Sequence, residues 1–290
     1  MTVKRADFRC LHRLRVRWAE VDMQKIVFNA HYLMYFDTAM GDYWRALALP
    51  YEAAMHQLEG DIYVKKASVE YFASARYDDQ LEVGIRCSRI GTSSIAFEGA
   101  IFRGDTLLVT GELLYVFADP NTQTSRPVPQ ALRALFNGFE AGESVVTVHS
   151  GKWSALQQQA SNLRQAVFVQ EQGINADLVW DAADASALHV VLTNRLGGAV
   201  ASGRLVQEAL GVGRIGRMAV ERVLRGSRLG HDVLQTLIQL ARKRGDHEVI
   251  LHALCNAQGF YARSGFIARG DVFTEAGLDH IEMVLALQSA

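Results

Sequence analysis

The sequence predicts an α+β protein of two domains, and three observations carry that prediction. The chain has 290 residues, which at roughly 100–200 residues per domain corresponds to two domains. Its first half alternates between apolar and polar residues over several stretches, and one long segment there shows helical spacing instead. In the second half, by contrast, predicted strands and helices alternate along the chain.

Composition and charge narrow the class of protein. Hydrophobic residues make up 49% and charged residues 21% of the chain, which excludes disordered and fibrous proteins. The net charge of −1 gives no electrostatic reason to expect nucleic acid or an anionic membrane as partner. No apolar run approaches the roughly 20 residues of a membrane span, and no secretory signal is expected. The three cysteines Cys10, Cys87 and Cys255 are far apart and lack metal-ligand spacing, so we expect no metal and a reducing, cytoplasmic compartment.

The first half predicts five strands and one long helix. Turn residues separate the alternating stretches, which cover residues 11–18, 62–71, 80–90, 94–103 and 107–118. The helix begins near Ala30 and runs for roughly 17 residues, with Asn29 as a plausible N-cap and Pro50 after its end. One long helix followed by a four-strand meander indicates a sheet wrapped over the helix.

The domain boundary is predicted near residue 145. A helical stretch reaching Phe139 closes the first half, and the small, polar segment 140–144 follows it. This division gives domains of residues 1–144 and 145–290.

The second half predicts a mixed sheet. A helix over 153–169 comes first, and a loop at 225–230 opens a second helix that runs through Val233 to Ala241. A short helix surrounds Phe260 and Tyr261. Strands are expected at residues 189–193, 200–206, 215–220 and 249–254, near Phe266, and at 280–287. The order strand, loop, helix, strand in the middle indicates a parallel crossover.

An acidic residue stands in the predicted loop before the first long helix. Asp22 follows the first strand. Backbone N–H groups at a helix start carry partial positive charge and can polarise a carbonyl oxygen, while a nearby carboxylate attacks the carbonyl or activates water. The alternative is that Asp22 is a solvated loop acid or a cap, as most loop acids are.

The residues around Asp22 resemble a known signature. Asp22, the pair Ile26 and Val27, Phe28 and Tyr32 match in order the motif of hotdog-fold acyl-CoA thioesterases of the 4-hydroxybenzoyl-CoA thioesterase and YbgC-like group. Residues 75–81 resemble the turn that precedes the long strands of that family, and the similarity covers roughly residues 11–135.

The resemblance implies a hotdog fold and hydrolysis of an acyl-CoA. Asp22 would be the catalytic group, either as nucleophile or as general base, and Asn29 and Tyr32 would bind substrate. Family sites form across two protomers, so a homodimer or homotetramer is implied. A glycine is common in the family two residues before the second member of the Ile–Val pair, and Lys25 stands in this part of the loop. His31 is expected on the helix surface.

A second feature is the Gly/Arg-rich loop of residues 225–230, which opens a helix. Such a loop can present successive N–H groups to a pyrophosphate, and Arg225 and Arg228 add positive charge. By itself this pattern is equally compatible with a solvated basic turn.

The wider context resembles a GCN5-related N-acetyltransferase (GNAT), closest to its ElaA-like branch, over roughly residues 152–288. Four segments carry the resemblance: residues 164–172, 215–220, 225–230 and 260–266. Within the phosphate loop, Arg228 replaces the usual middle glycine. The resemblance implies that the pantetheine arm pairs with Met218, Ala219 and Val220, that the CoA pyrophosphate binds Arg225, Gly226, Arg228, Leu229 and Gly230, and that Tyr261 protonates the departing thiolate.

The two resemblances share one chemistry, the handling of CoA thioesters. We therefore predict a bifunctional enzyme with acyl-CoA and acetyl-CoA as substrates, an amine as acceptor and no permanently bound cofactor. The alternative is one active domain with the other serving as an acyl-CoA-sensing or assembly module. The base that deprotonates the amine is not identified, and Glu171, His189 and His280 are candidates.

Overall fold

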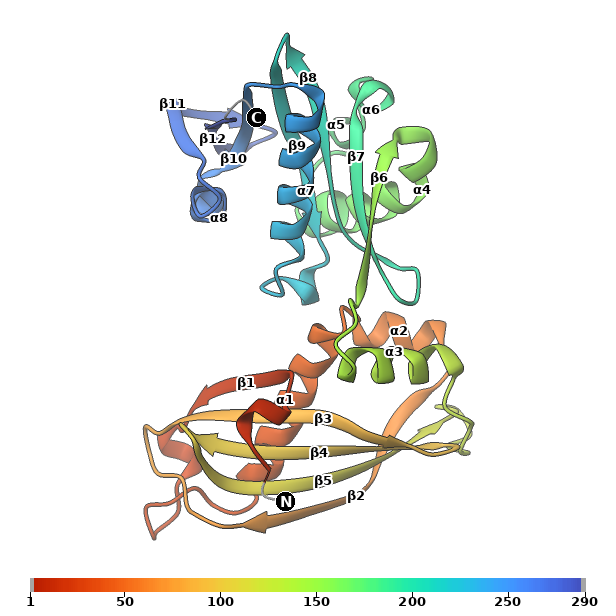
Figure 1. Ribbon diagram of the computed structural model, residues 1–290, viewed down its shortest axis with the longest axis vertical. Helices are drawn as coiled ribbons and strands as arrows, with labels where there is room; N and C mark the ends of the chain where they lie inside the picture. The colour runs from red at the N-terminus through yellow and green to blue at the C-terminus, as the bar shows by residue number, and fades with distance from the viewer. Residues whose placement is uncertain (1–2, 288–290) are drawn as a thin grey trace. The chain divides into compact units, whose positions relative to one another are not determined.

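An antiparallel sheet of five strands forms the first half of the computed structural model, which describes residues 3–287 (Figure 1). Its strands lie in the order β1-β3-β4-β5-β2. The elements of this unit are β1 (Cys10–Arg15), α1 (His31–Ala46), α2 (Tyr51–Gln57), β2 (Asp61–Tyr71), β3 (Gln80–Ile90), β4 (Ser94–Arg103), β5 (Thr106–Ala118) and α3 (Gln130–Glu140). The predicted strands and the long helix are confirmed in the hotdog arrangement, although β1 ends early because Trp18–Glu20 form a 3₁₀ turn. The short helix α2 was not predicted.

Helix α1 packs closely on the sheet because two glycines face it. Gly99 of β4 and Gly111 of β5 are register partners, and a Cβ atom at either position would lie 2.4 or 2.6 Å from the Phe36 ring. Phe36 is completely buried there. The glycine pair therefore sets how deeply the helix sits, and with it the height of the loop that leads into the helix.

The predicted N-cap of α1 is wrong. The helix begins at His31, and Ala30 occupies the cap position with no side-chain hydrogen bond to the helix. A backbone turn replaces the cap, since the His31 amide donates to the Phe28 carbonyl at 2.9 Å. Asn29 contributes its own carbonyl, which accepts from the Tyr71 hydroxyl at 3.2 Å.

A mixed sheet of seven strands forms the second half, with the order β11-β12-β10-β9-β8-β7-β6. The chain divides into two compact units between Val145 and Val146. The strands are β6 (Val146–Lys152), β7 (Leu188–Asn194), β8 (Ala199–Ala209), β9 (Val212–Val220), β10 (Glu248–Leu254), β11 (Ile267–Glu275) and β12 (Leu278–Ala286), and the helices are α4 (Trp153–Arg164), α5 (Ala176–Val179), α6 (Ala183–Ser186), α7 (Leu229–Arg244) and α8 (Gln258–Ala262).

Most predicted elements of this half are confirmed, including the parallel crossover from β9 through α7 to β10. The single helix predicted over 153–169 is instead α4 followed by a π-helical turn, Gln165–Glu171. Strand β6 and the short helices α5 and α6 were not predicted. β6 pairs with β7 at the edge of the sheet. Its strand conformation therefore depends on a partner far away in the sequence, which local patterns do not reveal.

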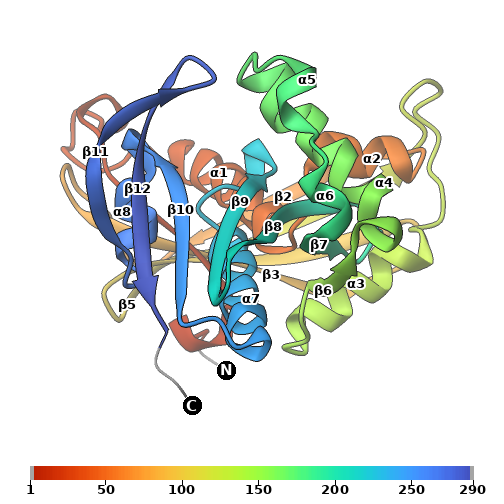
Figure 2. The same ribbon diagram turned by 90° about the horizontal axis from the view of Figure 1, so that it is seen from above.

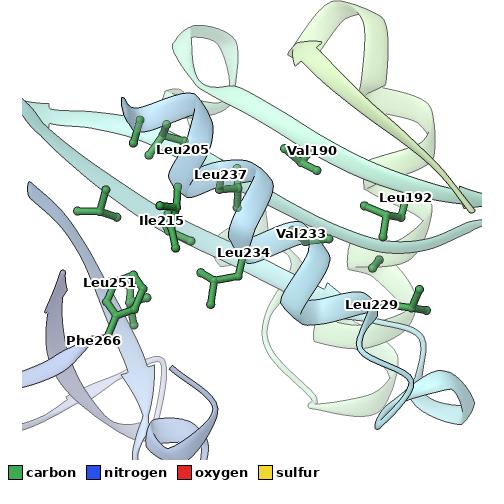
Figure 3. Packing of buried hydrophobic residues seen from close by; sticks show 14 of the residues in the cluster. Val190, Leu192, Leu205, Ile215, Leu229, Val233, Leu234, Leu237, Leu251 and Phe266 are labelled. Carbon is green, nitrogen blue, oxygen red and sulfur yellow. The ribbon is translucent and has the colours of Figure 1, made fainter. Parts of the chain in front are cut away.

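Helix α7 covers one face of this sheet. Val233, Leu234 and Leu237 are completely buried against residues of β7 to β10 (Figure 3). Gly203 of β8 permits the contact, since a Cβ there would lie 2.8 Å from Leu237 and 2.9 Å from Val233. The start of α7 is thus held at a fixed height above the end of β9.

Strands β9 and β10 separate partway along their length. They pair only from Glu248–Val212 to Leu251–Ile215, and beyond that point β10 continues alongside β12 while β9 continues alongside β8 (Figure 2). Among the described strands, none pairs with the edge of β9 that faced β10 once the two have diverged. The part of β9 beyond this point includes Met218, Ala219 and Val220, the residues that the resemblance assigned to the pantetheine arm.

The backbone is left-handed in both loops at the residues that stand in place of the family's common glycine. Lys25 has φ +61° and Arg228 has φ +70°, so each adopts the conformation that glycine would adopt most easily. The replacements therefore change side-chain chemistry and strain, and they leave the turns in place. Among residues 3–287, no helix combines the length and apolar character needed to cross a bilayer.

We expect Lys25→Gly to stabilise the protein. The substitution relieves a left-handed conformation that costs a non-glycine residue about 1 kcal/mol, partly offset by the greater freedom of glycine in the unfolded chain. The free energy of unfolding, measured by urea titration, should rise. The control is Ala131→Gly, at an exposed position of α3 without positive φ, where glycine brings only its entropic cost and should lower stability. A loss of stability in Lys25→Gly comparable to that of the control would contradict the strain.

Candidate active sites

A tight hairpin holds Asp22 in the segment that leads into α1. The Asp22 amide donates to the Ile26 carbonyl and the Lys25 amide donates to the Asp22 carbonyl, both at 2.9 Å. One carboxylate oxygen, Oδ1, accepts from the Gln24 amide at 2.8 Å, which orients the side chain. The residue is half-buried, so the carboxylate is fixed by the loop and still reachable.

Glu20 anchors this hairpin, although its sequence pattern did not single it out. Its carboxylate accepts from the Arg17 amide at 2.7 Å and from the Tyr35 hydroxyl at 2.8 Å, in a buried position. Burial raises the pKa of Glu20, but the hydrogen bonds from Arg17 and Tyr35 outweigh it and hold the pKa below its ordinary value. The only signal in the sequence was the i, i+3 spacing of Arg17 and Glu20, which is common on solvated turns.

Tyr32 lies inside the unit, with 3% of its surface exposed. Its hydroxyl accepts from the Ala75 amide at 3.0 Å, and the Ala75 carbonyl accepts from the Val27 amide at 2.9 Å. Burial raises the pKa of Tyr32. In this conformation Tyr32 joins α1 to the loop of Asp22 and presents no surface to a substrate, whereas Asn29 is exposed.

Two of the amides at the start of α1 are already bonded. His31 and Tyr32 donate to the carbonyls of Phe28 and Asn29. A thioester carbonyl oxygen could therefore accept hydrogen bonds only from the remaining backbone amides in the first turn of α1. The half-buried ring of His31 contacts that of Phe28 edge to face, with centroids 6.1 Å apart.

In the second unit, a cavity of about 650 Å³ lies where α7 begins. It brings together nearly all the residues predicted for CoA, from the end of β9, the loop before α7 and helix α8. Ala219 is the exception, because its side chain is buried against Leu163 and Val167 and does not line the cavity. The residues that do line it are Met218, Val220, Arg225, Gly226, Arg228, Leu229, Gly230 and Tyr261.

The two loop arginines differ in their partners. Arg225 forms a bidentate ion pair with Glu171, at 2.6 and 2.7 Å. This hydrogen bonding holds the pKa of Glu171 below its ordinary value. Arg228 is exposed, and no ion pair to it is present within residues 3–287. The Arg228 guanidinium can therefore bind a phosphate in this conformation, whereas Arg225 would first have to break its ion pair with Glu171.

Tyr261 lies at the junction of two cavities. It lines the cavity at the start of α7 and also a second cavity of about 540 Å³, and Gln172, Met218 and Ala257 are common to both. Burial raises the pKa of Tyr261 to about 12, so the phenol stays protonated at neutral pH and carries a proton that it can donate.

The structure separates the three base candidates. His189 is completely buried, with Nε2 bonded to the Asp184 carbonyl at 2.9 Å and its pKa lowered by burial. Glu171 is tied to Arg225. Neither residue lines the second cavity, so the structure does not favour either of them as the general base. His280 does line it.

Comparisons with known proteins agree with the two units. Residues 16–136 match the thioesterase-like superfamily, and residues 156–287 match the acetyltransferase (GNAT) domain. The acyl-CoA thioester hydrolase YbgC of Escherichia coli is 30% identical over 124 residues, which are 42% of this chain and 92% of that protein. The UPF0039 protein C11D3.02c of Schizosaccharomyces pombe is 32% identical over 127 residues, which are 43% of this chain and 84% of that protein.

Among solved structures, a 1,4-dihydroxy-2-naphthoyl-CoA thioesterase from Synechocystis shares 17% identity over 44% of this chain and 94% of its own, with a TM-score of 0.41. The family assignment rests on the sequence matches above. The first half of the chain thus belongs to the YbgC-like family of hotdog-fold thioesterases, and the second half belongs to the GNAT family.

Proposed function

We propose that the first half hydrolyses an acyl-CoA with Asp22 as the catalytic carboxylate. The observation that carries this proposal is the placement of Asp22 in a hydrogen-bonded hairpin, with one oxygen oriented by the Gln24 amide, in the segment that leads into α1. The other oxygen can attack the thioester carbonyl or take a proton from an attacking water. The membership in the YbgC-like family supports the same substrate class.

Replacing Asp22 tests this directly. Asp22→Ala should lower the rate of acyl-CoA hydrolysis by about 10²–10⁴, because general-base or nucleophilic groups contribute that much. The measurement is release of free thiol across a series of acyl-CoA chain lengths. Asp105→Ala, at an exposed carboxylate in the β4–β5 turn, is the matched control and should keep the wild-type rate. Unchanged turnover in the Asp22 variant would refute the assignment.

We also propose that this half works as a homodimer, with strand β2 at the interface. β2 is an edge strand of eleven residues, and most of it is exposed, including Tyr63 at 38% and Val64 at 55%. A long exposed edge with apolar side chains is the surface on which another strand pairs. Large exposed apolar side chains near the site, Phe28 and Met34, support the same interface.

A charge placed on this edge should split the assembly. Val64→Lys adds a third cation beside Lys65 and Lys66, so two copies facing each other would repel. Light scattering at micromolar concentration should give at least a dimer for the wild type and a monomer for the variant, with loss of hydrolysis. Val148→Lys, on the exposed edge strand β6 of the other unit, should change neither. A wild-type monomer with full hydrolytic activity would exclude the dimer.

For the second half, we infer transfer of an acetyl group from CoA to an amine. The unpaired edge of β9 can pair with the pantetheine arm, and the loop at the start of α7 can take the pyrophosphate with its N–H groups and Arg228. Tyr261, protonated and placed between the two cavities, would return a proton to the departing thiolate. CoA thioesters are substrates here, and no permanently bound cofactor is invoked.

Two variants of Arg228 separate the side chain from the backbone. Arg228→Glu should weaken CoA binding by about tenfold or more, because a phosphate donor becomes a repelling charge. Arg228→Gly keeps the left-handed turn and should cost less. The measurement is calorimetric titration of CoA into residues 146–290, which form a compact unit with their own core. Arg242→Glu, at an exposed arginine farther along α7, is the control. Equal affinity in all four proteins would place the pyrophosphate on backbone groups alone.

The alternative, that one half is a silent sensing or assembly module, keeps one observation in its favour. Arg225 is occupied by Glu171 in this conformation. The absence of glycine at Lys25 and Arg228 does not favour it, since both residues keep a left-handed backbone. The thiols of Cys10, Cys87 and Cys255 are all free, which supports a reducing compartment such as the cytoplasm.

A further inference from the structure

The second cavity, where the acceptor amine would sit, has a histidine that no sequence motif singles out. His252 lies on β10, just past the point where that strand leaves β9. Its Nδ1 lies 2.9 Å from Oε2 of Glu275 in β11. Its ring contacts the Phe273 ring edge to face, with the ring centroids 4.9 Å apart. Its side chain is 31% exposed and lines the cavity.

The strand register explains why these residues meet. His252 stands opposite Glu282 of β12, and Glu275 stands opposite Leu278 of the same strand. Leu278 and Glu282 are an even number of residues apart, so they share one face of the sheet, and their partners His252 and Glu275 share it too. The pairing therefore follows from the fold of three strands and does not depend on a flexible loop.

The carboxylate defines the proton positions on the ring. Burial raises the pKa of Glu275, but the bond with His252 outweighs it and the pKa lies below its ordinary value. An ionised carboxylate only accepts hydrogen bonds, so the proton of a neutral imidazole is on Nδ1. Nε2 is then free to accept a proton, and no residue within 3–287 bonds to it.

We propose that His252 is the general base of the acetyl transfer and that Glu275 is its positioning residue. This inference rests on the proposed transfer function. The arrangement explains how an amine that enters protonated can become a nucleophile next to Tyr261, which lines the same cavity.

The protons and bonds of the step balance. Nε2 takes one proton from the ammonium group of the acceptor, and the amine nitrogen then forms a bond to the acetyl carbonyl carbon. The C–S bond breaks, and the thiolate takes the proton of the Tyr261 hydroxyl. The second amine proton returns to the phenolate, and the imidazolium releases its proton to solvent.

Other charged groups surround His252, and most already have partners. His280 has Nδ1 at 2.8 Å from the Leu278 carbonyl, a neutral acceptor that would stabilise an imidazolium less than a carboxylate does. Glu282 is paired with Arg269. The remaining charged groups of the cavity are Asp177, Asp181, Arg204, Arg214 and Arg217.

The test uses the full chain carrying Asp22→Ala, so that acetyl-CoA is not consumed by the first half. Acetylated product is measured by mass spectrometry with ethylamine, spermidine and lysine methyl ester as acceptors, and with hydroxylamine. The alkylamines are protonated at neutral pH and need a base, whereas hydroxylamine is already neutral there. His252→Gln should lower kcat/KM for the best alkylamine by about 10²–10⁴, with KM for acetyl-CoA unchanged, and should spare transfer to hydroxylamine.

The pH profile and two further variants separate catalysis from structure. His252→Gln should lose the fall in rate that the parent chain shows at acidic pH. His247→Gln, the same change at an exposed histidine that does not line the cavity, should keep both rate and profile. Glu275→Gln retains an acceptor for Nδ1–H and should keep much more activity than Glu275→Ala.

Each failure has its own signature. Transfer to alkylamines with unchanged rate and profile in His252→Gln overturns the assignment of the base while leaving the transferase function intact. A loss in His280→Gln and not in His252→Gln would assign the role to His280. If the parent chain acetylates no amine, the proposed transfer falls and this inference falls with it.

Discussion

Close approach of a helix to glycines in a sheet is the constraint on which both sites depend. Phe36 of α1 rests where Gly99 and Gly111 face each other, and α7 rests in the same way on Gly203. In each case a Cβ atom on the sheet would push the helix away, since it would lie less than 3 Å from a side chain of the helix. Both candidate sites are built on the loop that enters this helix, so the depth of packing sets the position of Asp22 and of Arg228.

The Asp22 hairpin and the loop before α7 each place a charged residue at a position where the backbone must be left-handed. A left-handed residue is required at the turn in each, and the chain uses Lys25 and Arg228. Such strain persists only where the surroundings over-determine the backbone. The Asp22 hairpin is over-determined by its own backbone bonds and by Glu20, and the second loop by the burial of Leu229 directly after it. A cation is thereby placed at each loop without loss of its shape.

A buried ionic network supports the wall of the acceptor cavity. Arg164 is 1% exposed and binds both carboxylate oxygens of Asp184, and Arg204 bridges Asp184 to Asp181. Arg217 joins the network through Asp181 at 3.0 Å. Removing one member would leave a buried charge unpaired, which costs about 3–5 kcal/mol, so the network holds the segment around α5 and α6 as a unit. The rigidity of this wall matters because His252 and Tyr261 line the same cavity.

The sequence by itself determined most of the elements and their order, the two families and the loops that carry the sites. Periodicity and turn residues are local signals, so the strands of the first half and the β9–α7–β10 crossover could be predicted within a few residues. Only the tertiary structure decided which polar groups meet. Glu20 finds Tyr35 across 15 residues, Arg225 finds Glu171 across 54, and His252 finds Glu275 across 23. These pairings depend on strand register and helix packing, which one sequence does not encode locally, and they separate a buried histidine such as His189 from one that can accept a proton.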